Sequence, residues 1–125
     1  MNLTQFLIKY KDPDIERPFR PRIRCKDGFE FSAQASEFHY CEPRENYGPY
    51  ASIELGFPSH GDSLIQKYAE SPKSCRKTVY GWVPFNVVEE LIAKHGGITK
   101  YRDSEKVLHK AQWWTEEANS KVYEE

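Results

Sequence analysis

The chain has 125 residues, which is enough for one domain that buries a core of its own. Lys and Arg number 18 against 19 Asp and Glu, and this near balance argues against a general polyanion binder and against a strongly acidic DNA mimic. Only 38% of the residues are hydrophobic but 14% are aromatic, so we expect large rings to fill the core.

Residues 1–16 are predicted to form an N-terminal arm. Leu3, Phe6, Leu7 and Tyr10 recur at helical spacing, which indicates a short helix or an irregular packing arm. The polar, proline-broken stretch KDPDIERP then ends it.

The stretch PRIRCKDGFEFSAQAS alternates apolar and polar residues on both sides of a turn and predicts a β-hairpin. A two-residue Asp27-Gly28 loop would place cations and rings on the same face, against this alternation. A three-residue loop from Lys26 to Gly28, with Gly28 in the left-handed conformation of a G1 bulge, keeps the two kinds apart. We therefore predict the longer loop, with these apolar residues on one face: Pro21, Ile23, Cys25, Phe29, Phe31 and Ala33.

Residues 36–49 are predicted to form an irregular contact loop, and YASIELGF after it a third strand. The alternation of this strand points Ala51, Ile53, Leu55 and Phe57 inward and leaves Ser52 and Glu54 outward.

The remaining elements complete a mixed fold. DSLIQKYAE (62–70) predicts a short helix capped by Asp62 or Ser63, and TVYGWV a fourth strand in which Gly81 suggests a bend or a close approach. PFNVVEELIAKHGG predicts a helix with a glycine C-cap, and residues 103–122 a final helix. The expected architecture is one α+β domain over residues 1–125: an antiparallel sheet of about four strands with two or three helices packed on one face.

A row of arginines is the most specific candidate for binding. Strand geometry places Arg20, Arg22 and Arg24 on the polar face of the hairpin at steps of about 7 Å, close to the phosphate spacing of an extended strand. Tyr80 or Trp82 on the same face would add stacking for a nucleotide or a single strand. Glu30 lies directly opposite Arg24, however, so ordinary cross-strand ion pairs explain the row as well.

The loop raises two chemical alternatives. His39, Cys41, His60 and Cys75 supply the atoms of a Cys₂His₂ zinc site, but they lack the usual tight pairs. The neighbours His39 and Arg44 would lower the pKa of the Cys41 thiol, although no nucleophile signature surrounds it. The simpler interpretation is that these are loop residues satisfied by backbone hydrogen bonds.

Other sites are less defined. Trp113, next to Trp114 on the predicted final helix, is either covered by the N-terminal arm or exposed as an interface. No P-loop, G-x-G-x-x-G, H-E-x-x-H, G-x-S-x-G or EF-hand pattern occurs. No apolar run approaches the roughly 18 residues of a membrane span, and MNLTQFLIKYKD meets charge too early for a signal peptide. With three cysteines and no C-x-x-C pair, we expect a cytoplasmic protein with reduced thiols.

Two segments carry a resemblance. RPRIRCKDGFEFSAQAS followed by HYCEPR, and VYGWVP followed by a helix ending KHGGI, resemble small accessory proteins encoded by phages and prophages of Gram-positive bacteria. The resemblance covers about residues 20 to 98 and brings no catalytic motif. It implies the cytoplasm of a host bacterium and an anti-defence role, as in anti-CRISPR proteins that act by binding a nuclease.

We therefore expect a non-enzymatic binding protein, without a cofactor, that contacts a protein such as a host nuclease or nucleoprotein complex. Direct contact with nucleic acid is left open. The alternatives are a nucleotide or small-molecule binder that uses the arginine face, and a zinc-stabilised interaction module. The expected contact residues are Arg20, Arg22, Arg24, His39, Tyr40, Arg44, Tyr47 and Trp113.

Overall fold

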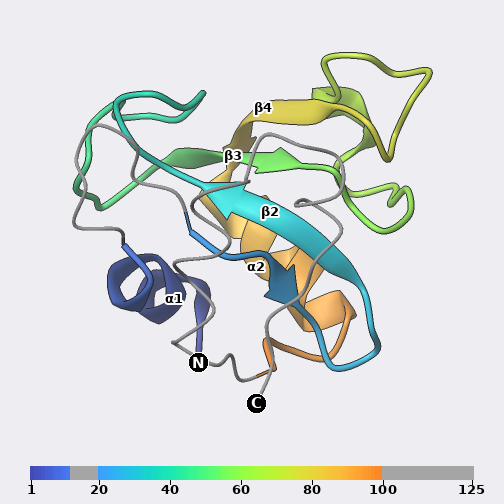
Figure 1. The fold of residues 1–125 in the computed structure, drawn as a ribbon, viewed down its shortest axis with the longest axis horizontal. Coiled ribbons are helices and arrows are strands. Elements are labelled where there is room, and N and C mark those ends of the chain that lie inside the picture. The colour runs from blue at the N-terminus through green and yellow to red at the C-terminus, as the bar shows by residue number, and fades with distance from the viewer. Residues whose placement is uncertain (12–19, 100–125) are drawn as a thin grey trace.

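The structure is a computed structural model that describes residues 1–11 and 20–99. Its four strands form one antiparallel sheet in the order β1-β2-β3-β4, with α2 behind the sheet and α1 beside it (Figure 1). This confirms the predicted α+β class. The elements are α1 (Leu3–Lys9), β1 (Ile23–Arg24), β2 (Glu30–Gln34), β3 (Ser52–Gly56), the 3₁₀ helix η1 (Gln66–Tyr68), β4 (Val79–Pro84) and α2 (Phe85–Lys94).

The sequence also predicted a final helix after these elements and no membrane span. The helix expected over residues 103–122, together with Trp113, lies outside the described residues. Among the described helices, none has the length and apolar character needed to cross a membrane.

The hairpin has the predicted register. Ile23 pairs with Phe31 and Arg24 with Glu30, and the amide of Cys25 donates to the carbonyl of Phe29 at 2.8 Å. Gly28 has a φ of 97°, as the three-residue turn requires.

The N-terminal segment is a helix, which confirms the first of its two predicted forms. The Asn2 side chain accepts from the Gln5 amide at 2.8 Å, and the Gln5 side chain accepts from the Asn2 amide at the same distance. This capping box satisfies two amides at the start of α1. The helix buries the residues that share its apolar stripe: Leu3, Phe6, Leu7 and the C-cap Tyr10.

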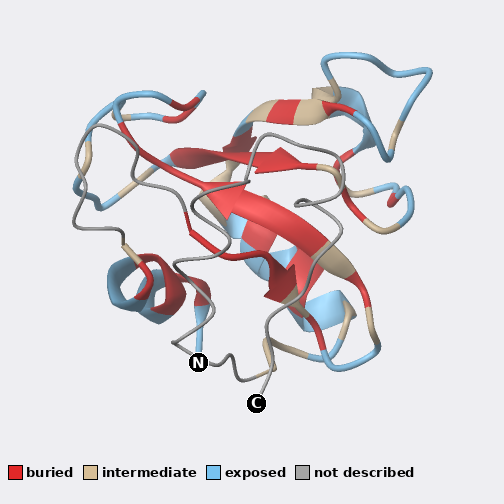
Figure 2. Ribbon diagram, viewed as in Figure 1, coloured by how far each residue is buried: buried red, intermediate tan, exposed pale blue. Residues whose placement is uncertain are grey.

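Strands β2 and β3 are buried on both faces (Figure 2). The predicted inward residues Ile53 and Leu55 do lie in the core, but Ala51 is exposed, and the predicted outward residues Ser52 and Glu54 are buried. The alternation failed here because the loop before β3 folds over its second face, where the Tyr40 amide donates to the Glu54 carboxylate at 3.0 Å.

The helix predicted over residues 62–70 is wrong. Asp62 does accept from the Leu64 amide at 2.9 Å, as a cap would, yet only the short η1 follows. The backbone then becomes extended at Ala69, which bridges to Tyr80, and the Glu70 amide donates to Val79 at 2.9 Å. Pairing with β4 therefore replaces further helical turns.

Helix α2 lies where the sequence predicted it and ends at two glycines. Gly96 and Gly97 both have a φ of 94°, and the Gly97 amide donates to the Ile92 carbonyl at 2.9 Å. This left-handed cap returns the chain toward the hairpin turn, where the Lys26 amide donates to Gly97 at 2.9 Å.

Candidate functional site

Two of the three arginines in the predicted row are buried, which corrects the expectation of an open basic face. Arg20 and Arg22 are each 1% exposed, and Arg24 is half-buried. Arg20 donates from Nε to the Leu7 carbonyl and from Nη1 to the Ala35 carbonyl, both at 2.9 Å. The polar face of the hairpin is thus packed against α1 and the loop, and Arg20 and Arg22 offer no open row to a phosphate chain.

The loop residues His39 and Cys41 are also buried, so His39 is not the exposed contact that was expected. His39 Nδ1 lies 2.6 Å from the Ser36 hydroxyl oxygen, and the Cys41 thiol faces the Ser36 carbonyl at 3.2 Å. Burial raises the pKa of Cys41, although the Ser36 bond opposes it, so the thiol stays protonated at neutral pH. The raised pKa argues against the nucleophile alternative, and the contacts fit the simpler interpretation in which Cys41 is a loop residue satisfied by backbone carbonyls.

An exposed aromatic stack is the most developed surface feature of the described chain. Strand β4 has two residues, Gly81 and Trp82, at the point where β3 has only Glu54, so the strand bulges. The bulge turns Trp82 to a φ of 49° and leaves it 52% exposed. Its ring stacks on Tyr40, with the ring centres 4.8 Å apart, and its amide donates to the Tyr40 carbonyl at 3.0 Å.

Arg44 extends this surface with a positive charge. Its guanidinium carbon lies 5.6 Å from the centre of the Tyr40 ring, which is within the range of a cation–π contact. No carboxylate among residues 1–11 and 20–99 forms an ion pair with it. We call Tyr40, Arg44 and Trp82 the Trp82 patch. Two of its three members, Tyr40 and Arg44, were predicted as contact residues.

Glu54 supports the patch from beneath. Its carboxylate accepts from the Tyr40 amide at 3.0 Å and is only 7% exposed. Burial raises the pKa of Glu54, while the bond from Tyr40 opposes this. The buried carboxylate therefore fixes the Tyr40 backbone, and through it the ring on which Trp82 stacks.

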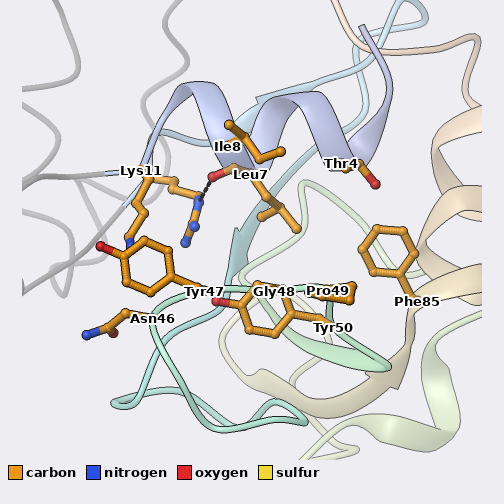
Figure 3. Close-up of a pocket in the computed structure, with 11 residues that line it drawn as sticks. Thr4, Leu7, Ile8, Lys11, Asn46, Tyr47, Gly48, Pro49, Tyr50 and Phe85 are labelled. Carbon is orange, nitrogen blue, oxygen red and sulfur yellow. Dashed lines mark hydrogen bonds between the residues drawn. The ribbon is translucent and has the colours of Figure 1, made fainter.

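A cavity of about 770 Å³ opens between α1 and the end of the loop. Thr4, Leu7 and Ile8 of α1 line one side, residues 46–50 the other, and Phe85 one end (Figure 3). Arg20 and Lys11 add two positive charges to its wall. Tyr47, a predicted contact residue, lines this cavity and is 71% exposed.

A third cluster joins the hairpin turn to the end of α2. His95 places Nδ1 at 2.7 Å from Asp27 and Nε2 at 2.8 Å from Asp62, and its ring stacks on Phe29 with centres 4.0 Å apart. Lys94 reaches the other Asp62 oxygen at 3.1 Å. We call Asp27, Asp62, Lys94 and His95 the clasp, because its contacts hold together three segments that are distant in the sequence.

Metal binding finds no support in the described part of the chain, where no three His, Cys, Asp or Glu residues lie together as metal ligands would. His39 and Cys41 both face Ser36 instead. Comparison with protein-family models, with curated proteins and with solved structures found no match to this chain. The resemblance to phage accessory proteins stays a prediction.

The sequence suggested Trp82 only as a stacking residue beside the arginine row, not as one of the expected protein contacts, and it did not predict the cavity. A signal for Trp82 was present, because Gly81 within a strand pattern is typical of a bulge that re-aims its neighbour. The cavity left no such signal, since its walls come from α1, the loop and the start of α2.

Proposed function

We propose that this chain is a binding protein that acts through protein contacts at the Trp82 patch. The observation that carries the proposal is the exposed Trp82 ring, held by a left-handed backbone that costs a residue other than glycine about 1–2 kcal/mol. Folding gains little from a ring that is half in water. Strain kept at such a position is typical of functional sites.

Phe57 provides the contrast within the same chain. It also has a positive φ, 50°, but its side chain is half-buried and its carbonyl accepts from Arg22 at 2.8 Å. The fold itself therefore uses that conformation. Trp82 has no comparable burial, so a contact with another molecule accounts for it better.

The composition of the patch defines the partner. Two stacked aromatic rings suit an apolar hollow, and the exposed guanidinium of Arg44 suits a carboxylate beside that hollow. Tryptophan, tyrosine and arginine are the residues most enriched among binding hot spots. We therefore expect a protein partner with an acidic group at the edge of an apolar pocket.

More specifically, we propose that the chain is a phage or prophage protein that inhibits a host defence nuclease and has no enzymatic activity of its own. The resemblance of residues 20 to 98 to phage accessory proteins supports this form, and the raised pKa of Cys41 argues only against the alternative of a thiol nucleophile. In the nuclease, the expected docking surface would combine the same acidic and apolar features.

Matched arginine variants test the proposal. In a bacterium whose CRISPR nuclease clears a target plasmid, the wild-type chain should protect the plasmid and retain the nuclease on affinity purification. Arg44→Ala should weaken retention about tenfold or more, as expected for a hot-spot residue. Arg76→Ala should not, because Arg76 is an exposed residue of the loop between η1 and β4.

The two variants also define failure. Equal retention by Arg44→Ala and Arg76→Ala would refute the patch as the contact surface. Plasmid clearance that the wild-type chain leaves unchanged, across representative nuclease types, would remove the inhibitor form of the proposal.

A further inference from the structure

The cavity between α1 and the loop has walls of two kinds. Most of its surface is apolar, with Leu7, Ile8, Tyr50 and Phe85 among the lining residues, and its volume of about 770 Å³ is within the range of about 300–1,000 Å³ that is usual for small-molecule sites. Two cationic side chains, Arg20 and Lys11, also line the cavity.

Neither cation is paired with an acid among the residues that the structure describes. Arg20 donates to the carbonyls of Leu7 and Ala35 and is hydrogen-bonded to the Tyr50 side chain, whereas the buried side-chain nitrogen of Lys11 has no hydrogen-bond acceptor among the described residues. That nitrogen lies 2.9 Å from the centre of the Tyr47 ring, so it contacts the π face of this ring. Within the described part of the chain no carboxylate offsets these two positive charges, and burying an unpaired charge is costly.

Burial disfavours the positive charge of Arg20. Burial lowers the pKa of Arg20, and only the nearby Tyr50 and Cys41 groups oppose this. Neither of these groups is charged at neutral pH. An anion in the cavity would compensate both cations, and an apolar body attached to it would cover the rest of the wall.

We infer that this cavity is a binding site for an amphipathic organic anion, in which Lys11 meets the acidic head, the charge of the buried Arg20 adds to the field behind it, and α1, Tyr50 and Phe85 meet an aromatic or aliphatic body. This site is independent of the Trp82 patch. It shares no residue with the patch, and its ligand is a small molecule rather than a protein.

Two fluorescent compounds with the same aromatic body test the inference. Anilinonaphthalene sulfonate carries the anion, and N-phenyl-1-naphthylamine lacks it. Calorimetric titration of the full chain should show saturable binding of the sulfonate at least about tenfold tighter than binding of the neutral compound. Methyl NMR signals of Leu7 and Ile8 should shift along with the sulfonate titration. Equal affinities for the two compounds, or binding that leaves these signals unmoved, would overturn the inference.

Charge variants distinguish specific binding in the cavity from nonspecific hydrophobic binding of the dye. Lys11→Met should weaken sulfonate binding about tenfold, whereas Lys73→Met, at an exposed lysine that does not line the cavity, should leave it unchanged. Because Ile8 is 73% exposed at the rim, Ile8→Glu and Ile8→Lys should both fold. Both remove the same apolar side chain, yet the glutamate should weaken binding relative to the lysine. Equal effects of the two Ile8 variants would contradict the role of charge.

Discussion

The two ends of strand β2 are built in opposite ways. At the end beside the hairpin turn, the clasp sets His95 between two carboxylates, and every left-handed residue in the turn and the α2 cap is a glycine: Gly28, Gly96 and Gly97. At the other end, the loop buries His39 beside Ser36 and holds the exposed Trp82 in a left-handed conformation. Figure 1 shows the turn and the loop at opposite ends of β2.

The two ends of β2 therefore differ in how much they contribute to the stability of the fold. The clasp end combines ion pairs, a ring stack and turns made by glycines, and the left-handed Phe57 at this end of β3 is half-buried with its carbonyl bonded to Arg22. The loop end accepts a buried neutral histidine, a buried carboxylate and backbone strain. Features that cost stability concentrate at functional sites, and this loop end carries both the Trp82 patch and one wall of the cavity.

The largest expected effect is acid destabilisation through His39. Burial, with help from the charges of Arg20 and Arg44, lowers the pKa of His39 from 6.5 to about 3. Because this folded pKa is depressed, the unfolded chain binds a proton that the folded chain does not, and stability falls as the pH drops below 6.5. Between pH 7 and pH 4.5 the loss should be about 2–3 kcal/mol in the free energy of unfolding, measured by urea denaturation.

His39→Asn is the matched control for this effect. Asparagine offers the Ser36 hydroxyl a similar hydrogen bond and does not titrate, so the pH profile of the variant should be flatter by about the same 2–3 kcal/mol. Glu54 has a raised pKa and acts in the opposite direction, but both chains contain it. Parallel profiles for the two chains would mean that His39 is not the acid-sensitive group.

The opposite pH dependence is expected at the clasp. Burial disfavours the charged ring of His95, but its bonds to Asp62 and Asp27 outweigh this and raise its pKa. Because the folded pKa is raised, His95 stabilises the folded state fully below the unfolded pKa of about 6.5. This stabilisation is lost as the pH rises through the folded pKa. The pKa values of Asp27 and Asp62 are lowered, so their contribution is present above about 3.8 and fades in stronger acid. The clasp should therefore be strongest between about pH 4 and 6.5.

His95→Gln tests this window. At pH 5.5 the variant should lose about 1–2 kcal/mol in the free energy of unfolding, mainly through the bond to the buried Asp62, because the exposed Asp27 is screened by water. At pH 9 the loss should be smaller. A loss of the same size at both pH values would assign the role of His95 to stacking on Phe29 instead.

The sequence predicted the parts of this architecture that are set locally. Alternation and the KDG turn predicted the hairpin register, apolar stripes predicted α1 and α2, and the glycines after α2 predicted where it ends. It failed for Arg20 and Glu54, because their burial depends on segments that arrive from elsewhere in the chain. The clasp is similar: Asp62 was expected only as a cap, and no pattern links it to His95, 33 positions later.

The smallest effect separates backbone strain from contact at Trp82. Trp82→Ala and Trp82→Gly both remove the stack on Tyr40, but only glycine adopts a positive φ without penalty. Urea denaturation should therefore find the glycine variant more stable than the alanine variant by about 1 kcal/mol. Equal stabilities would show that the bulge relaxes and that no strain is stored there.

Partner binding should separate the two roles of Trp82, in recognition and in the fold. Both Trp82 variants should lose the protein partner, because the ring that fills the apolar hollow is absent in each. The glycine variant trades the stack for relief of strain, so its stability should stay within about 1 kcal/mol of the wild type. A variant that folds as well as the wild type yet no longer binds would show that the tryptophan serves recognition rather than the fold. Retained binding by Trp82→Gly would instead place the contact surface away from the patch.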